Sequence, residues 1–157
     1  MKCVAEWIVP SRVRNVALIT AGLEAFCGMN GFSERDSRQL QVAVEGVFAY
    51  CARTLSGNGE YTCIRCKLFW EDRRITVELE YSGKGGELDE MLRPDKNRPV
   101  RRTSFEAMGV FIARELLESL VCISRYDLAL GGRLNTYTLT YSLGADEGAS
   151  VAGADHA

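Results

Sequence analysis

Apolar residues recur at helical spacing in two stretches near the start of the chain, and this pattern predicts two amphipathic helices. A short extended segment, 5–10, precedes the first helix, and Ser11 is positioned to cap it. Gly28 and the Asn30-Gly31 pair are expected to end this helix. The second helix begins after Ser33, which forms a capping-box pattern with Asp36. The two apolar stripes consist of Val13, Val16, Thr20, Leu23 and Cys27, and of Leu40, Val44, Val47 and Cys51.

Alternation of apolar and polar residues predicts two hairpins in the rest of the chain. The first hairpin joins residues 61–70 and 74–81 through the tight polar turn 71–73. The second joins residues 121–125 and 134–143. A third helix precedes the second hairpin, and its apolar side carries Val110, Ala113, Leu117 and Leu120.

A long irregular segment, 87–104, separates the first hairpin from the third helix. It contains Pro94 and Pro99 and is rich in charge. Loops of this length are usually functional lids or disordered segments. The last residues, 144–157, are small and polar, and we expect them to be disordered.

The order of these elements predicts the fold class. Strands joined by hairpins cannot form a doubly wound parallel sheet, whereas helices pack naturally on one face of a mostly antiparallel sheet. We therefore expect an α+β fold, a two-layer α/β sandwich with a mostly antiparallel mixed sheet and its helices on one face. A chain of 157 residues suits a single core, so residues 1–143 are expected to form one domain.

The composition argues against two classes of partner. A formal net charge of −2 creates no global field that would attract nucleic acid or a membrane surface. No apolar run approaches the length of a membrane span, and the N-terminus has no apolar core of a signal peptide. We therefore expect a cytoplasmic protein that binds neither nucleic acid nor membrane.

The six cysteines, in a chain without a signal peptide, are expected to be reduced and mostly buried. Cys63 and Cys66 form a CxxC pattern within a predicted strand. The period of two places their sulfurs on opposite faces, which is a poor geometry for a disulfide or a shared metal ion. The only histidine, His156, lies in the tail. The sequence thus predicts no metal site and no histidine-dependent nucleophile.

Three short segments carry a resemblance to a known family: LQVAVEGVFAYCART in the second helix, YSGKGG after the first hairpin, and EAMGVFIARELLESL in the third helix. Together with the element order, they resemble the GHKL, or histidine-kinase-like, ATPase fold. More closely, they resemble the bacterial anti-sigma-factor serine kinases, over the chain up to about Leu143. The resemblance implies ATP and magnesium as cofactors and a protein partner such as a sigma factor or an anti-sigma-factor antagonist. The family commonly dimerises, so a homodimer is one expected state.

The first two segments match the family in part. Glu45 stands at the position of the glutamate that acts as general base, and Ala49 stands one helical turn later, where the family has the asparagine that holds magnesium. Tyr81 stands at the position of the aspartate that binds the adenine amino group. Gly83 and Gly85 match the glycines that let the backbone pass close to the nucleotide.

The third segment and the preceding loop supply the phosphate-binding positions that the resemblance implies. Gly109 matches the second of two glycines that open the third helix, and Ala107 stands at the first. The amides at such a helix start receive phosphate. Arg101 and Arg102 lie where a family member would meet the terminal phosphate or its partner protein; a solvated charged loop is the alternative. Lys84 is either a phosphate contact or an exposed loop lysine.

Three hypotheses of function follow. An alanine offers no oxygen to magnesium, and a tyrosine would fill an adenine site, so the first hypothesis is a regulatory protein with weak or lost ATP binding. It would act by protein–protein binding in a partner-switching pathway. The second is an active ATP-dependent serine/threonine kinase, an anti-sigma factor, in which Glu45 is the base. The third is a domain that binds another small ligand in a remodelled pocket.

Overall fold

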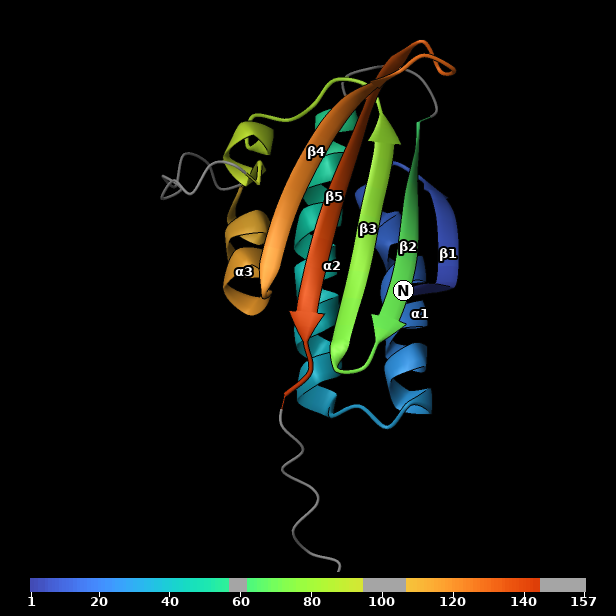
Figure 1. The fold of residues 1–157 in the computed structure, drawn as a ribbon, viewed down its shortest axis with the longest axis vertical. Coiled ribbons are helices and arrows are strands. Elements are labelled where there is room, and N and C mark those ends of the chain that lie inside the picture. The colour runs from blue at the N-terminus through green and yellow to red at the C-terminus, as the bar shows by residue number, and fades with distance from the viewer. Residues whose placement is uncertain (57–61, 95–106, 145–157) are drawn as a thin grey trace, which may run out of the picture.

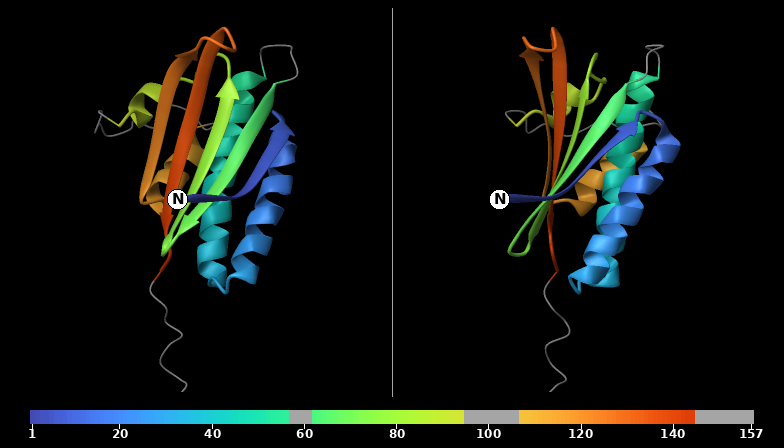
Figure 2. Two further views of the ribbon diagram at one scale, coloured as in Figure 1. Left: turned by 45° about the vertical axis from the view of Figure 1, so that its right-hand side comes forward. Right: turned by 90° about the vertical axis from the view of Figure 1, so that its right-hand side faces the viewer.

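The computed structural model describes residues 1–56, 62–94 and 107–144. In these residues a five-stranded sheet forms one layer and three α-helices form the other, so the fold is α+β with two layers, as predicted (Figure 1, Figure 2). The strands are β1 (Lys2–Pro10), β2 (Cys63–Glu71), β3 (Arg74–Ser82), β4 (Ser119–Asp127) and β5 (Gly132–Ser142). The helices are α1 (Val16–Met29), α2 (Glu34–Leu55) and α3 (Met108–Leu116), with short 3-10 helices η1 (Val13–Asn15) and η2 (Asp89–Leu92).

The strand order in the sheet is β1-β2-β3-β5-β4, and all four pairings are antiparallel. The expectation of a mixed sheet is therefore wrong for the described strands. The physical reason is that β1 and β2 are joined by two helices that run in opposite directions, as Figure 1 shows. This pair returns the chain to the end where β1 finished, so β2 runs back beside it. The two hairpins continue the alternation of direction.

The two predicted helix starts have different outcomes. The capping box is confirmed: the Asp36 N–H donates to Ser33 Oγ at 3.0 Å, and the Ser33 hydroxyl donates to Asp36 Oδ2 at 2.8 Å. The cap by Ser11 is wrong, because η1 precedes α1 and neither helix has a side-chain cap. Asn15, the residue before α1, donates its side-chain amide to the Pro10 carbonyl at 2.8 Å instead.

The third helix is shorter than its apolar pattern predicts. It ends at Leu116, because Leu117 is extended, with φ −93° and ψ 150°. The Glu118 N–H then donates to the Thr140 carbonyl at 2.8 Å, so the chain has already entered the sheet. Leu120 therefore belongs to β4. It is still buried, which explains why its apolar character fitted a helical stripe.

The core lies between the helices and the inner face of the sheet. The apolar stripe of α2 is fully buried, as predicted, and Cys66 is buried while Cys63 is exposed, so the CxxC sulfurs lie on opposite faces. The described part of the long irregular segment also packs into the core: Leu88, directly before η2, and Leu92, at its end, are buried. Residues 95–104 of that segment, and residues 145–157 of the predicted tail, lie outside the described residues. None of the described helices is long and apolar enough to span a bilayer.

Asp36 is a buried carboxylate that connects the start of α2 to the end of β5. The Tyr141 hydroxyl donates to Asp36 Oδ1 at 2.7 Å, and the Gly144 N–H donates to the same oxygen at 3.2 Å. Burial alone would raise the pKa of Asp36, but the hydrogen bonds from Tyr141, Ser33 and Gly144 outweigh burial. They hold its pKa below the ordinary value of 3.8.

This shift predicts a pH dependence of stability. Because the pKa of Asp36 is lower in the folded state than in the unfolded state, its stabilising effect is complete above the unfolded-state pKa and is lost as pH falls through the folded-state pKa. The difference in free energy of unfolding between wild type and Asp36→Asn should therefore be constant near neutral pH and shrink below about pH 4. Urea unfolding at a series of pH values measures it. A difference that stays constant down to about pH 2 would contradict the assigned role.

Candidate functional site

The glycine turn that follows β3 is held to the neighbouring strand β5. Gly83 has a φ of 133°, a backbone conformation that glycine adopts without strain. Its N–H donates to the Arg133 carbonyl at 2.9 Å, and the side-chain amide of Asn135 donates to the Gly83 carbonyl at 2.9 Å. Both peptide groups of this turn residue are thus engaged by β5, which fixes the direction in which the chain leaves the sheet.

The next two glycines allow close contact with side chains of the protein itself. A Cβ atom on Gly85 would lie 2.4 Å from Asp89 Oδ2. A Cβ atom on Gly86 would lie 2.0 Å from the Tyr50 hydroxyl oxygen. Neither position has space for a side chain, so the glycines of this turn are required by internal packing.

Asp89, at the start of η2, is the centre of a buried hydrogen-bond cluster and is 4% exposed. Its Oδ1 accepts from the Tyr50 hydroxyl at 2.9 Å and from the Tyr137 hydroxyl. Its Oδ2 accepts from the Gly86 N–H at 2.9 Å. The Leu88 N–H donates to the Tyr50 oxygen at 3.0 Å, so that hydroxyl is satisfied as donor and acceptor. The cluster ties α2, β5 and the glycine turn together.

Three tyrosine rings complete this cluster. Tyr81 and Tyr137 stack with their ring centroids 5.9 Å apart and an interplanar angle of 16°, and their hydroxyl oxygens are 3.2 Å apart. Tyr50 meets Tyr137 edge-on at 6.1 Å. Burial, with the nearby Asp89 carboxylate, raises the pKa of Tyr50, and burial likewise raises the pKa of Tyr81 and of Tyr137, so all three stay protonated donors. We call Tyr50, Tyr81, Tyr137 and Asp89 the tyrosine–aspartate cluster.

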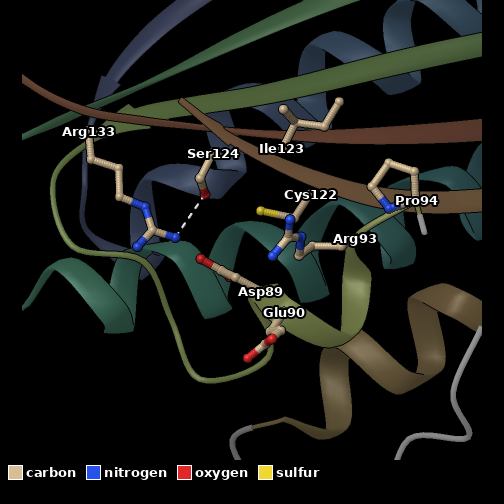
Figure 3. A pocket seen from close by; sticks show the side chains of 8 residues that line it. All are labelled: Asp89, Glu90, Arg93, Pro94, Cys122, Ile123, Ser124 and Arg133. Atoms are coloured by element: carbon tan, nitrogen blue, oxygen red, sulfur yellow. Dashed lines mark hydrogen bonds between the residues drawn. The ribbon is translucent and has the colours of Figure 1, made fainter. Parts of the chain in front are cut away.

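Two open pockets lie beside the glycine turn. The first, of about 570 Å³, is lined by the last turns of α2, by the turn itself and by Ala107 before α3. The second, of about 600 Å³, is lined by η2, by β4 and by Arg133 of β5 (Figure 3). Tyr50 reaches the first pocket and Asp89 reaches the second. The tyrosine–aspartate cluster thus borders both.

Helices α2 and α3 approach each other at a pair of glycines. A Cβ atom on Gly46 would lie 2.3 Å from the Gly109 carbonyl oxygen, and one on Gly109 would lie 2.9 Å from the Gly46 Cα. The two backbones are therefore in direct contact. Gly109, which the resemblance implies as a phosphate-binding glycine, here packs against another helix.

The structure brings together some of the predicted site residues but not all of them. Gly85 and Ala107 line the same pocket. Glu45 is exposed on α2 and lines neither of the two pockets beside the turn, whereas Ala49 is buried. Tyr81 lies in the tyrosine–aspartate cluster. The predicted positions Arg101 and Arg102 lie outside the described residues.

Sequence reasoning missed Asp89, Tyr50 and the glycine contact at Gly46. Asp89 lies in GELDEML, which reads as an acidic solvated loop. Tyr50 directly follows Ala49 and reads as one more apolar helix residue. The sequence did contain one signal for the glycine contact. Gly46 and Gly109 each place a glycine inside one of two helices that were expected to pack on the same face of the sheet.

Comparisons with models of protein families and with curated proteins found no match, so the proposed function rests on the geometry. Within residues 1–56, 62–94 and 107–144, no group of three or more His, Cys, Asp or Glu side chains is arranged to hold a metal ion.

Proposed function

We propose that this protein is a cytoplasmic regulatory domain with the histidine-kinase-like ATPase fold, and that it acts by binding a protein partner with ATP binding weak or lost. The partner would be a sigma factor or an anti-sigma-factor antagonist in a partner-switching pathway, and the resemblance also implies a homodimer. One observation carries this proposal: the tyrosine–aspartate cluster is buried at the glycine turn and is fully hydrogen-bonded within the protein.

The cluster opposes binding of an adenine base. Tyr81 stands at the position that the resemblance implies for the adenine-reading aspartate, and it is 2% exposed. Its hydroxyl pairs with Tyr137, whose own hydroxyl donates to Asp89. A base could occupy the position of these rings only if at least one of them left the core, at a cost of about 1.5–3 kcal/mol for each large side chain that becomes exposed.

The described residues also do not fit a magnesium–nucleotide complex. Ala49 offers only a methyl group at the position of the magnesium ligand, and it is buried. Glu45 is exposed to solvent and has no described oxygen donor one helical turn later to share an ion with. No catalytic step that requires magnesium is therefore derived for this protein.

A protein partner is supported by exposed apolar side chains at one end of the sheet. Tyr126, Leu128 and Leu130, at the connection between β4 and β5, are 66%, 89% and 63% exposed. Asp127 Oδ1 accepts from the backbone N–H groups of Ala129 and Leu130 at 2.9 and 3.1 Å, so the connection is ordered while its apolar side chains face solvent. Grouped exposed apolar residues of this kind are typical of contact surfaces.

The proposal is tested with a sigma factor or antagonist encoded in the same genome. The chain and this candidate partner are mixed in nucleotide-free buffer and analysed by size-exclusion chromatography. In parallel, ATP labelled at the γ-phosphate is added, and label on the partner is measured. We expect a complex without nucleotide and no transfer of label. Transfer of label, or a complex that forms only with ATP and magnesium, would instead support the active kinase.

A further inference from the structure

The pocket between η2 and the edge of the sheet contains an arginine whose orientation is fixed. This pocket has a volume of about 600 Å³, which lies in the range typical of small-molecule sites. Figure 3 shows the Arg133 guanidinium directed toward Ser124, with a dashed line for the hydrogen bond between them. Among the described residues, none of the positions that the family resemblance assigned to a nucleotide lines this pocket.

Three hydrogen bonds, each to a neutral acceptor, hold Arg133 and its neighbours. The Arg133 Nε–H donates to Asn135 Oδ1 at 2.9 Å, and an Nη2–H donates to Ser124 Oγ at 2.9 Å. The Ser124 hydroxyl donates to the same Asn135 oxygen at 2.7 Å. Asn135 is 0% exposed and is itself fixed to the Gly83 carbonyl. The guanidinium is therefore positioned before any ligand arrives, which lowers the entropic cost of binding.

The positive charge of Arg133 has no ion-pair partner among the described residues, although Asp89 lines the same pocket. The Asp89 oxygens accept from Tyr50, Tyr137 and Gly86 instead. Two of the five guanidinium N–H groups are engaged, which leaves three to bind a ligand. Burial raises the pKa of the Cys122 thiol to about 11, so this lining residue adds no negative charge.

The rest of the lining defines the kind of ligand. Ile123, which is 54% exposed, and Pro94 form an apolar wall, and a second arginine, Arg93, lines the pocket from the end of η2. A guanidinium pairs best with an oxyanion that accepts two parallel hydrogen bonds. We propose that this pocket binds a small organic anion, whose carboxylate or phosphate group pairs with Arg133 and whose apolar part lies against Ile123 and Pro94.

The proposal is tested by titrating the whole chain with three probes that carry the same butyl chain: pentanoate, butyl phosphate and butylammonium. Backbone amide shifts in ¹H–¹⁵N NMR spectra report binding. We expect saturable shifts at Ser124, Arg133 and Gly83 with pentanoate or butyl phosphate and none with butylammonium. The anion that binds more tightly identifies the oxyanion group. The proposal would be overturned if neither anion shifted the signals of these residues, or if butylammonium shifted them equally.

Variants separate this site from unspecific attraction of anions. Arg133→Gln should weaken anion binding by at least about tenfold, because a charge-assisted pair is lost. Arg133→Lys should also weaken it, since the ammonium lacks the planar fork. Arg125→Gln is the matched control: Arg125 is an exposed arginine of the same hairpin that does not line the pocket. Spectra that are unchanged away from the pocket show that each variant is folded. Equal weakening by Arg125→Gln would overturn the proposal.

Glu90 supplies a test in the opposite direction. It is exposed and lines the same pocket, so its carboxylate repels an anion bound at Arg133. Glu90→Gln should therefore tighten the binding of the anionic probe several-fold. Weaker binding in this variant would contradict an anion held in this pocket.

Discussion

Replacing Asp89 with alanine is expected to lower the free energy of unfolding by about 3 kcal/mol or more, because a hydrogen bond to a charged group contributes about 1.5–3 kcal/mol. The variant would leave the Tyr50 and Tyr137 hydroxyls and the Gly86 N–H without their acceptor in a buried region. Unsatisfied buried donors are costly because they have also lost water. Urea denaturation followed by circular dichroism measures the change.

Two variants control this prediction. Glu87→Ala removes an exposed acidic residue from the same segment and should change stability by less than about 0.5 kcal/mol. Asp89→Asn keeps one acceptor oxygen for the tyrosine hydroxyls, so its loss of stability should lie between those of wild type and Asp89→Ala. If Asp89→Ala were as stable as Glu87→Ala, the cluster would not hold the glycine turn in place.

Replacing Gly46 with alanine is expected to destabilise the fold by about 1–3 kcal/mol, although alanine is the better helix former. The added Cβ would lie 2.3 Å from the Gly109 carbonyl oxygen and 2.7 Å from its carbonyl carbon. These are backbone atoms, so the clash cannot be relieved by a side-chain rotation. Helices α2 and α3 would have to separate, and core contacts of Val110 and Ala113 would be lost with them.

Gly28→Ala is the matched control for this prediction. Gly28 also lies in a helix, but a Cβ atom there would meet nothing within 4 Å. This variant should be neutral or more stable by up to about 1 kcal/mol, since alanine restricts the unfolded chain. Thermal unfolding of both variants, followed by circular dichroism, measures the difference. Equal stability of Gly46→Ala and Gly28→Ala would contradict a direct backbone contact between α2 and α3.

The predicted helices and hairpins depend on local patterns, and each of them is present in the structure for that reason. The exception is Val13 of the first predicted stripe, which lies in η1 and is exposed. The period of the α2 stripe and the polar turn before Arg74 are each contained within a few residues. The predicted boundary between α3 and β4 was wrong. Leu120 was assigned to the helix because its side chain is apolar, but it is buried equally well in the strand. Periodicity reports that a side chain is buried, but not whether the backbone around it is helical or extended.

The candidate site was harder to predict because its contacts join residues that are far apart in the chain. Asp89 binds Tyr50 and Tyr137, at separations of 39 and 48 residues, and Tyr81 pairs with Tyr137 at a separation of 56. No local pattern encodes such pairs. Each tyrosine alone reads as a core residue of its own helix or strand, and only the packed fold shows that two of the hydroxyls meet on one carboxylate while the third pairs with one of them.

The glycine turn acquires a different physical role from this geometry. A strand that runs into several glycines is a common cradle for phosphate, since the backbone can approach a ligand closely. Here Gly85 and Gly86 approach Asp89 and Tyr50, which belong to the same chain. A turn of this composition can therefore serve internal packing as fully as it would serve a nucleotide.

The most direct test of this account is isothermal titration calorimetry of the 157-residue chain with magnesium–ATP. The account predicts no saturable heat at millimolar nucleotide. Tyr81 and Tyr137 fill the position at which the resemblance implies an adenine base, and Ala49 provides no ligand to magnesium. Glu45→Ala should behave like the wild type. Saturable micromolar binding that requires magnesium and is lost in Glu45→Ala would contradict the account and support a working nucleotide site.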